Sequence, residues 1–322
     1  MRRNLSFLFY FVAFIGPVSS YVFAETHQAA LKQGPHDAQL GDVRIHYVVS
    51  GHGPLIFMTS VGWGLSSLLY QNGLKPLEDH FTMVYVDERG NGDSSQPEDL
   101  KQMSSSVMAD DLDHLRDYLG LDKICLIGHS SGGTITLEYA ERHPTHLEKG
   151  ILIDPAVLGD RDDKQIEEYI SLWKDDPKYK KAVKNVPDDD DTPKTNAEAT
   201  ARLLSYINLY FSNPEIYVPI FLKQAKGSQV SATTENAHKA ADRVAAREQR
   251  QDYGIVQAKI LIINGTVDWI CPYQVAQRIY QGISGSELDL YANVGHFPWI
   301  EEPHRFFSDV TAFLDQKITP TR

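Results

Sequence analysis

The chain has 322 residues, of which 42% are hydrophobic and 23% are charged, and its formal net charge at pH 7 is −12. This is the composition of a globular protein with ample core-forming material, and it excludes a disordered or collagen-like chain. An acidic chain without a basic patch repels phosphate backbones, so we expect no nucleic-acid partner.

The first 24 residues differ in character from the rest. A basic start, "MRRN", precedes the apolar stretch "LSFLFYFVAFIG", and "VFA" puts Val22 and Ala24 at −3 and −1 of a cleavage site after Ala24. This is the form of a secretory signal peptide. The alternative is an uncleaved membrane anchor, for which the apolar block is short. We therefore expect a secreted or periplasmic protein with no stable membrane association after cleavage.

Apolar runs bounded by turn signals recur along the remaining chain and predict strands. The central runs are nearly continuous in valine, isoleucine and leucine, as in strands buried on both faces of a parallel sheet. The first run alternates, as an edge strand would. The runs are 43–51, 54–60, 81–87, 123–130, 149–154, 259–265 and 287–294.

Helical patterns at 104–119, 132–143, 272–283 and 302–318 separate these strands. Alternating strands and helices predict an α/β fold with a mostly parallel sheet and right-handed crossovers. The alternation fails once, between Pro155 and about Ala258, where the pattern is mostly helical. Because that segment is too long for a loop, we predict a helical insertion folded over one end of the sheet.

The segment "GHSSGG" (128–133) ends a predicted buried strand and opens a helix. Its first five residues form G-x-S-x-G, in which small residues on both sides let the strand turn sharply and expose the central hydroxyl. This context predicts Ser130 as a nucleophile. The alternative is a glycine-rich helix start with a capping serine.

A serine nucleophile needs a base, and twelve histidines compete for that role. His296 follows the last predicted strand, so it should lie at the same sheet edge as Ser130. The carboxylate that orients the base has two candidates, Asp268 and Asp154, both at strand ends. We favour Asp268, because its glycine-led loop can reach His296. We expect Asp154 to line the floor of the site or to hold a turn.

Cys125 and Cys271 are the only cysteines and do not make a disulfide framework. We favour two unpaired, largely buried thiols, because Cys125 lies within a predicted buried strand. No spacing of cysteines and histidines indicates a zinc site. We expect neither a metal nor a cofactor.

Four motifs in this order resemble the α/β-hydrolase superfamily, and most closely its peptidase S33 or proline iminopeptidase-like branch. They are "VDERGNGDSS" (86–95), "GHSSGG" (128–133), "NGTVDWICP" (264–272) and "GHFPWIEEP" (295–303). The resemblance implies an α/β-hydrolase fold: a mostly parallel eight-stranded sheet with helices on both faces and a helical cap after the sixth strand. It implies a core of residues 25–155 and 258–322 and a cap of residues 156–257.

The loop after the third strand of the fold departs from the family. Many relatives have His-Gly there, whereas this chain has Thr59-Ser60-Val61-Gly62-Trp63. The resemblance implies that the backbone N–H groups of Val61 and Ser131 form the oxyanion hole. The stretch "VGWGLSS" (61–67) is also close to a dinucleotide loop, but no clear acidic ribose partner follows it.

The resemblance implies a serine hydrolase that cleaves an ester, lactone or amide bond of a small molecule or short peptide through an acyl-enzyme. We expect Trp63, Trp173 and Tyr210 to contact substrate, with helix packing as the alternative for the aromatic residues of the cap. Three other functions stay open. They are a proline iminopeptidase-like aminopeptidase, a C–C bond hydrolase, and a ligand-binding receptor on the same fold with little turnover.

Overall fold

A computed structural model describes residues 29–60, 62–160, 163–188, 191–248 and 251–316. The predicted signal peptide, residues 1–24, and the predicted oxyanion donor Val61 lie outside these described residues. Within the described residues, no helix combines the length and the apolar character that a membrane span requires.

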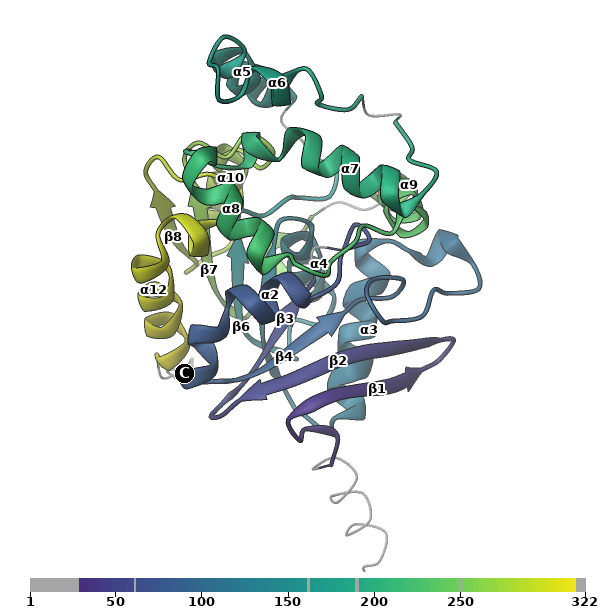
Figure 1. The fold of residues 1–322 in the computed structure, drawn as a ribbon. Coiled ribbons are helices and arrows are strands. Elements are labelled where there is room, and N and C mark those ends of the chain that lie inside the picture. The colour runs from purple at the N-terminus through teal and green to yellow at the C-terminus, as the bar shows by residue number, and fades with distance from the viewer. Residues whose placement is uncertain (1–28, 61, 161–162, 189–190, 249–250, 317–322) are drawn as a thin grey trace, which may run out of the picture.

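An eight-stranded sheet forms the centre of the molecule (Figure 1), in the order β1-β2-β4-β3-β5-β6-β7-β8. Strand β2 runs antiparallel to both of its neighbours, β1 and β4, and every pair from β4 to β8 is parallel. The mostly parallel sheet is therefore confirmed. The strands are β1 (Gly34–Leu40), β2 (Val43–Gly51), β3 (Leu55–Thr59), β4 (Thr82–Asp87), β5 (Ile124–His129), β6 (Leu147–Ile153), β7 (Lys259–Gly265) and β8 (Glu287–Tyr291).

The edge of the sheet differs from the prediction made from the apolar runs. Residues 43–51 form β2, which pairs on both sides, and β1 takes the edge position. The alternation in β2 arises because one of its faces is buried while the other is half-buried. Strand β1 has no apolar run, since only Ala38 and Leu40 of "GPHDAQL" are buried.

Helices cover both faces of the sheet, as predicted. Along β3, Phe57 packs into one buried cluster with residues of α3, α4 and α10, while Ile56 and Met58 face a second cluster with α2, α11 and α12. The helices are α2 (Leu68–Gly73), α3 (Ser105–Tyr118), α4 (Ser131–Arg142), α5 (Asp163–Trp173), α6 (Lys180–Val183), α7 (Asn196–Tyr206), α8 (Pro214–Gln224), α9 (Ala232–Glu248), α10 (Tyr273–Gly282), α11 (Pro298–Glu301) and α12 (Pro303–Asp315).

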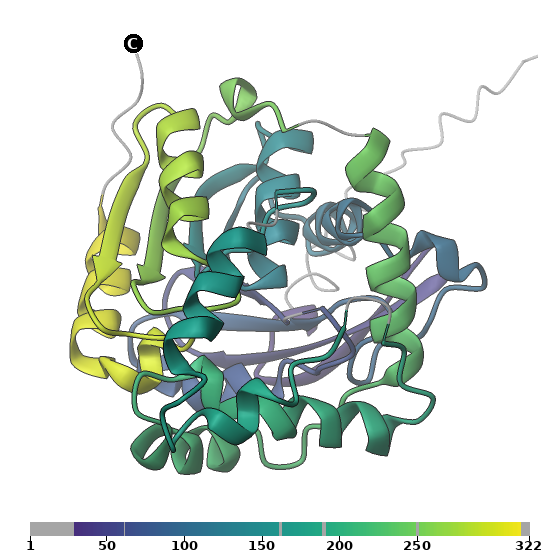
Figure 2. The same cartoon turned by 90° about the horizontal axis from the view of Figure 1, so that it is seen from above.

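Helices α5 to α9 all lie between β6 and β7 in the chain. Figure 1 shows them above one end of the sheet, and Figure 2 looks down on them with the strands beneath. We call them the inserted helices. Parallel strands place their carboxyl ends at one edge of a sheet, and loops at that edge bind ligands in open α/β folds.

Candidate active site

Ser130 lies between β5 and α4 in a backbone conformation that non-glycine residues rarely adopt, with φ 56°. The flanking glycines are required by close contacts. A Cβ on Gly128 would lie 2.1 Å from the carbonyl oxygen of Gly132, and one on Gly132 would lie 2.4 Å from Thr59 Oγ1. The turn therefore has the strain and the glycine spacing expected of a nucleophile elbow.

Asp268 and His296 are brought together from the loops after β7 and β8. His296 Nδ1 lies 2.7 Å from Asp268 Oδ2, and both side chains are buried. The other carboxylate oxygen, Asp268 Oδ1, accepts hydrogen bonds from the backbone N–H groups of Ile270 and Cys271. Because Nδ1 is bonded to the carboxylate, Nε2 is the imidazole nitrogen left to exchange a proton.

His129 precedes Ser130 but has both ring nitrogens engaged elsewhere. Nε2 lies 2.7 Å from the backbone oxygen of His296, and Nδ1 lies 2.9 Å from the hydroxyl of Tyr70. Since a carbonyl can only accept, Nε2 carries the hydrogen and Nδ1 accepts from Tyr70. Burial lowers the pKa of His129 well below its usual value. His129 thus holds the backbone of the His296 loop as a neutral imidazole.

Asp154 is fully buried at the end of β6 and does not bond to His296. Its Oδ1 accepts from the backbone N–H of Gly265 at 2.8 Å, whereas Oδ2 has no hydrogen-bond partner among the described residues. Burial, and next the charge of Asp268, raise the pKa of Asp154 well above its usual value. We infer that Asp154 is neutral and supports the turn that carries Asp268.

The loop after β3 is held by two side chains from the turn that follows β4. Both carboxylate oxygens of Glu88 lie 3.0 Å from the backbone nitrogen of Ser60, and Asn91 Oδ1 accepts from Gly64 N–H at 2.7 Å. Burial raises the pKa of Glu88 well above its usual value. Ser131, the second predicted oxyanion donor, is the first residue of α4 and is buried.

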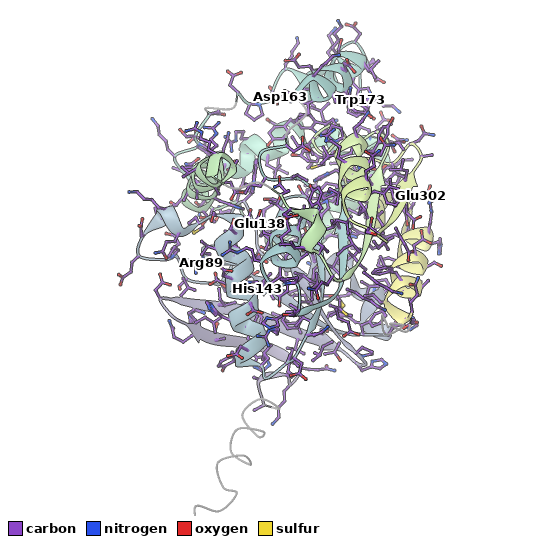
Figure 3. All side chains as sticks on the ribbon, turned by 180° about the vertical axis from the view of Figure 1, so that it is seen from behind. Arg89, Glu138, His143, Asp163, Trp173 and Glu302 are labelled. Carbon is purple, nitrogen blue, oxygen red and sulfur yellow. The ribbon has the colours of Figure 1, made fainter. Side chains whose placement is uncertain are left out.

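One cavity of about 470 Å³ lies between the sheet edge and the inserted helices, and Ser130, Ser131 and His296 all line it. Trp63 and Tyr210, two of the three predicted substrate contacts, also line it. Trp173, the third predicted contact, is not among the described residues that line the cavity. It lies in α5, high above the sheet (Figure 3), with its ring stacked 4.9 Å from that of Tyr179.

A model of the family described as "alpha/beta hydrolase fold" matches residues 61–303. The chain belongs to this family. The predicted superfamily is therefore confirmed, and the matched range includes the elbow, the acid loop and the histidine loop.

Two curated relatives and one solved structure show the breadth of the likeness. A soluble epoxide hydrolase of Corynebacterium sp. is 33% identical over 120 residues, which are 37% of this chain and 41% of the relative. A proline iminopeptidase of Lactobacillus crispatus is 25% identical over 245 residues, 74% of this chain and 82% of the relative. An esterase from Exiguobacterium antarcticum has a TM-score of 0.65 at 22% identity, covering 88% of this chain and all of that one. The iminopeptidase match agrees with the predicted S33-like branch.

Two groups of side chains in this alpha/beta hydrolase bring possible metal ligands within 4.8 Å of one another. In the first, Asp268 and His296 are bonded to each other beside Cys271. In the second, Asp113 is shared by His146 Nδ1 at 2.7 Å and Arg116 Nε at 2.8 Å, with His143 alongside. Hydrogen bonds among these side chains account for both arrangements.

Glu301 supports the histidine loop of this hydrolase and was not singled out from the sequence. Its Oε1 accepts from the backbone N–H of Gly295 at 2.9 Å, and Oε2 accepts from the backbone and hydroxyl of Ser212. It thereby ties the residue before His296 to the inserted helices. Burial raises the pKa of Glu301 to about 7.

The pKa of Glu301 predicts a specific pH dependence of stability. The pKa of Glu301 is higher in the folded protein than in the unfolded chain. The protonated side chain therefore contributes stability that is fully present below about pH 4.5 and is lost as the pH rises through about 7. The variant Glu301→Gln cannot ionise. Relative to wild type, its free energy of unfolding should rise by on the order of 3 kcal/mol between pH 4 and pH 8.

Urea denaturation of both proteins across this pH range measures the difference. A lost hydrogen bond to Gly295 would add a constant offset but no pH dependence. The control is Glu302→Gln at the exposed neighbouring position, which should follow wild type. A flat difference between wild type and Glu301→Gln would contradict the prediction.

Proposed function

We propose that this protein is a serine hydrolase that cleaves an ester, lactone or amide bond of a small molecule or short peptide. The chain belongs to a family of hydrolases. We propose in addition that Ser130, Asp268 and His296 form a catalytic triad and that the reaction passes through an acyl-enzyme. The observation that carries it is the meeting of a strained Ser130 and a buried Asp268–His296 pair at one cavity. A serine, a base and an orienting carboxylate are what nucleophilic acyl transfer requires.

The proposed reaction has two steps. His296 Nε2 takes the proton of the Ser130 hydroxyl, and the oxygen attacks the substrate carbonyl to give a tetrahedral oxyanion. The N–H of Ser131, and that of Val61 as implied by the family, stabilise this charge. The leaving group departs with the proton from His296. Water, deprotonated by the same imidazole, then attacks the acyl-enzyme. The bond between the acyl carbon and the Ser130 oxygen breaks, this oxygen takes the proton back from His296, and the acid is released.

The cavity favours an uncharged substrate with an apolar acyl part. Its lining is predominantly apolar and includes Trp63, Leu65, Leu69 and Phe297. Burying such a group gains roughly 25 cal/mol per Å² of apolar surface. We therefore expect small esters and lactones with hydrophobic acyl groups to react faster than charged ones.

An iminopeptidase must bind the free amino group of its peptide, and the cavity offers little for this purpose. Four acidic residues are among the described residues that line it: Asp160, Asp188, Glu235 and Asp242. Asp160 is bonded twice to Arg278, Glu235 to Arg202, and Asp242 to Ser105. Because three of the four are already engaged, we favour ester or lactone cleavage over removal of an N-terminal proline.

Labelling with a fluorophosphonate tests the reaction class. The folded protein, without residues 1–24, should be labelled within minutes, and peptide mapping should find the phosphonyl group on Ser130. Hydrolysis of p-nitrophenyl esters, lactones, prolyl amides and a β-diketone then compares the open substrate classes. An unlabelled protein that also leaves every substrate intact would support a ligand-binding receptor instead.

A further inference from the structure

Helix α9 is attached to the rest of the molecule along one face. Ser231, just before the helix, and Thr234, His238 and Asp242 within it are spaced three or four residues apart, so they lie on the same side. Three of them bond to three different segments near the candidate site. The contacts are Ser231 N to Gly64 O (2.9 Å), Thr234 Oγ1 to Gly90 O, and Ser105 N to Asp242 Oδ1 (2.7 Å).

His238 is fully buried in the middle of this face and is fixed by one ring nitrogen. Nε2 lies 3.0 Å from Ser105 Oγ and 3.1 Å from Asp242 Oδ2. Since the Ser105 hydroxyl donates to the carboxylate, both neighbours of Nε2 can only accept from it. Nε2 therefore carries a hydrogen, and the imidazole cannot turn without breaking these bonds.

The opposite edge of the ring lies against the loop after β3. A Cβ on Gly62 would lie 2.7 Å from His238 Cε1 and 3.0 Å from Nδ1, and 3.7 Å from Ser131 Oγ. Gly62 also has φ 77°, which disfavours any side chain. Nδ1 has no hydrogen-bond partner among the described residues. The ring thus occupies the space beside Gly62, next to the first residue of α4.

We propose that His238 is a positioning residue that holds the loop after β3, of which the structure describes residues 60 and 62–64, beside Ser131. The inference rests on the proposed function, because it assigns the inserted helices a part in acyl transfer. The core holds this loop through Glu88 and Asn91, and α9 holds it from the other side. An oxyanion donor acts only at hydrogen-bond distance from the developing charge, so a small displacement of the loop lowers the rate of acylation.

Two substitutions separate holding the loop from general packing. His238→Ala removes the ring and its anchor, whereas His238→Gln keeps an amide near the position of Nε2 that can still bond to Asp242. The matched control is His143→Ala at the far end of α4. It also breaks an imidazole–carboxylate pair, between His143 Nε2 and Asp110 Oδ1 at 2.8 Å, and it lies low in the molecule (Figure 3).

We expect His238→Ala to lower kcat on p-nitrophenyl butyrate, and the rate of fluorophosphonate labelling, by about 10- to 100-fold, with KM changed less than about threefold. This loss is smaller than the roughly 10²- to 10³-fold fall in kcat that follows the complete removal of one oxyanion donor. His238→Gln should recover a large part of the rate. His143→Ala should keep kcat within about twofold of wild type, although we expect its Tm to fall by about as much as that of His238→Ala.

Two results would overturn the inference while wild type remains active. One is a His238→Ala variant that has the wild-type kcat when it is assayed at a temperature well below its Tm. The other is an equal loss of kcat in His238→Ala and His143→Ala. A wild-type protein that neither hydrolyses the ester nor takes the label would instead overturn the proposed function, and the inference with it.

Discussion

The variant Ser130→Ala is expected to lose kcat on p-nitrophenyl butyrate by a factor of about 10⁴ or more, because the proposed acyl-enzyme forms on the Ser130 hydroxyl. The expected change in the free energy of unfolding is small, within about 1 kcal/mol, since the substitution removes one hydroxyl from a half-buried side chain. The two measurements together separate chemistry from folding.

Steady-state kinetics and urea denaturation of Ser130→Ala provide this comparison, and intact-mass analysis after fluorophosphonate treatment shows whether the label is lost. The matched control is Ser286→Ala. Its hydroxyl bonds to backbone oxygens in the turn before β8, and it is absent from the described residues that line the cavity. If Ser130→Ala kept more than a hundredth of the wild-type kcat, the nucleophile would have to be sought elsewhere.

Much of the core architecture could be predicted from the sequence because parallel strands leave a strong local signal. The runs that became β3 to β7 are apolar on both faces, and each is bounded by turn residues. Strand β1 could not be predicted in this way. Its sequence, "GPHDAQL", buries little, and it is a strand because β2 offers a free edge for pairing.

The residues of the candidate site differ in how far sequence reasoning could reach them. Ser130, Asp268 and His296 each follow a strand of the parallel sheet, so topology alone predicts a common edge. For Trp173, an aromatic residue on an inserted helix, the sequence does not show which side faces the cavity. His238 could not be found at all, because its position depends on how α9 packs against residues more than a hundred positions earlier.

Asp268→Asn and Asp154→Asn are expected to have very different effects, although both aspartates are fully buried at neighbouring strand ends. Asp268 Oδ2 accepts a hydrogen bond from His296 Nδ1. An asparagine at this position would point either its NH₂ group or its uncharged oxygen at Nδ1. The imidazolium formed during acylation would then lack its stabilising carboxylate. Loss of that charge in a serine–histidine–aspartate site typically lowers kcat by about 10⁴.

Asp154→Asn replaces a group that burial and the charge of Asp268 already keep neutral. The asparagine side-chain oxygen can still accept from Gly265 N–H, and its NH₂ stands where the carboxylic acid carries its proton. We therefore expect kcat of Asp154→Asn to stay within about tenfold of wild type, against the roughly 10⁴-fold loss for Asp268→Asn. Comparing kcat of both variants on one ester, with Tm as the check on folding, decides between the two acids. Equal losses in two folded variants would mean that the aspartates act as one unit, and a larger loss for Asp154→Asn would reverse their roles.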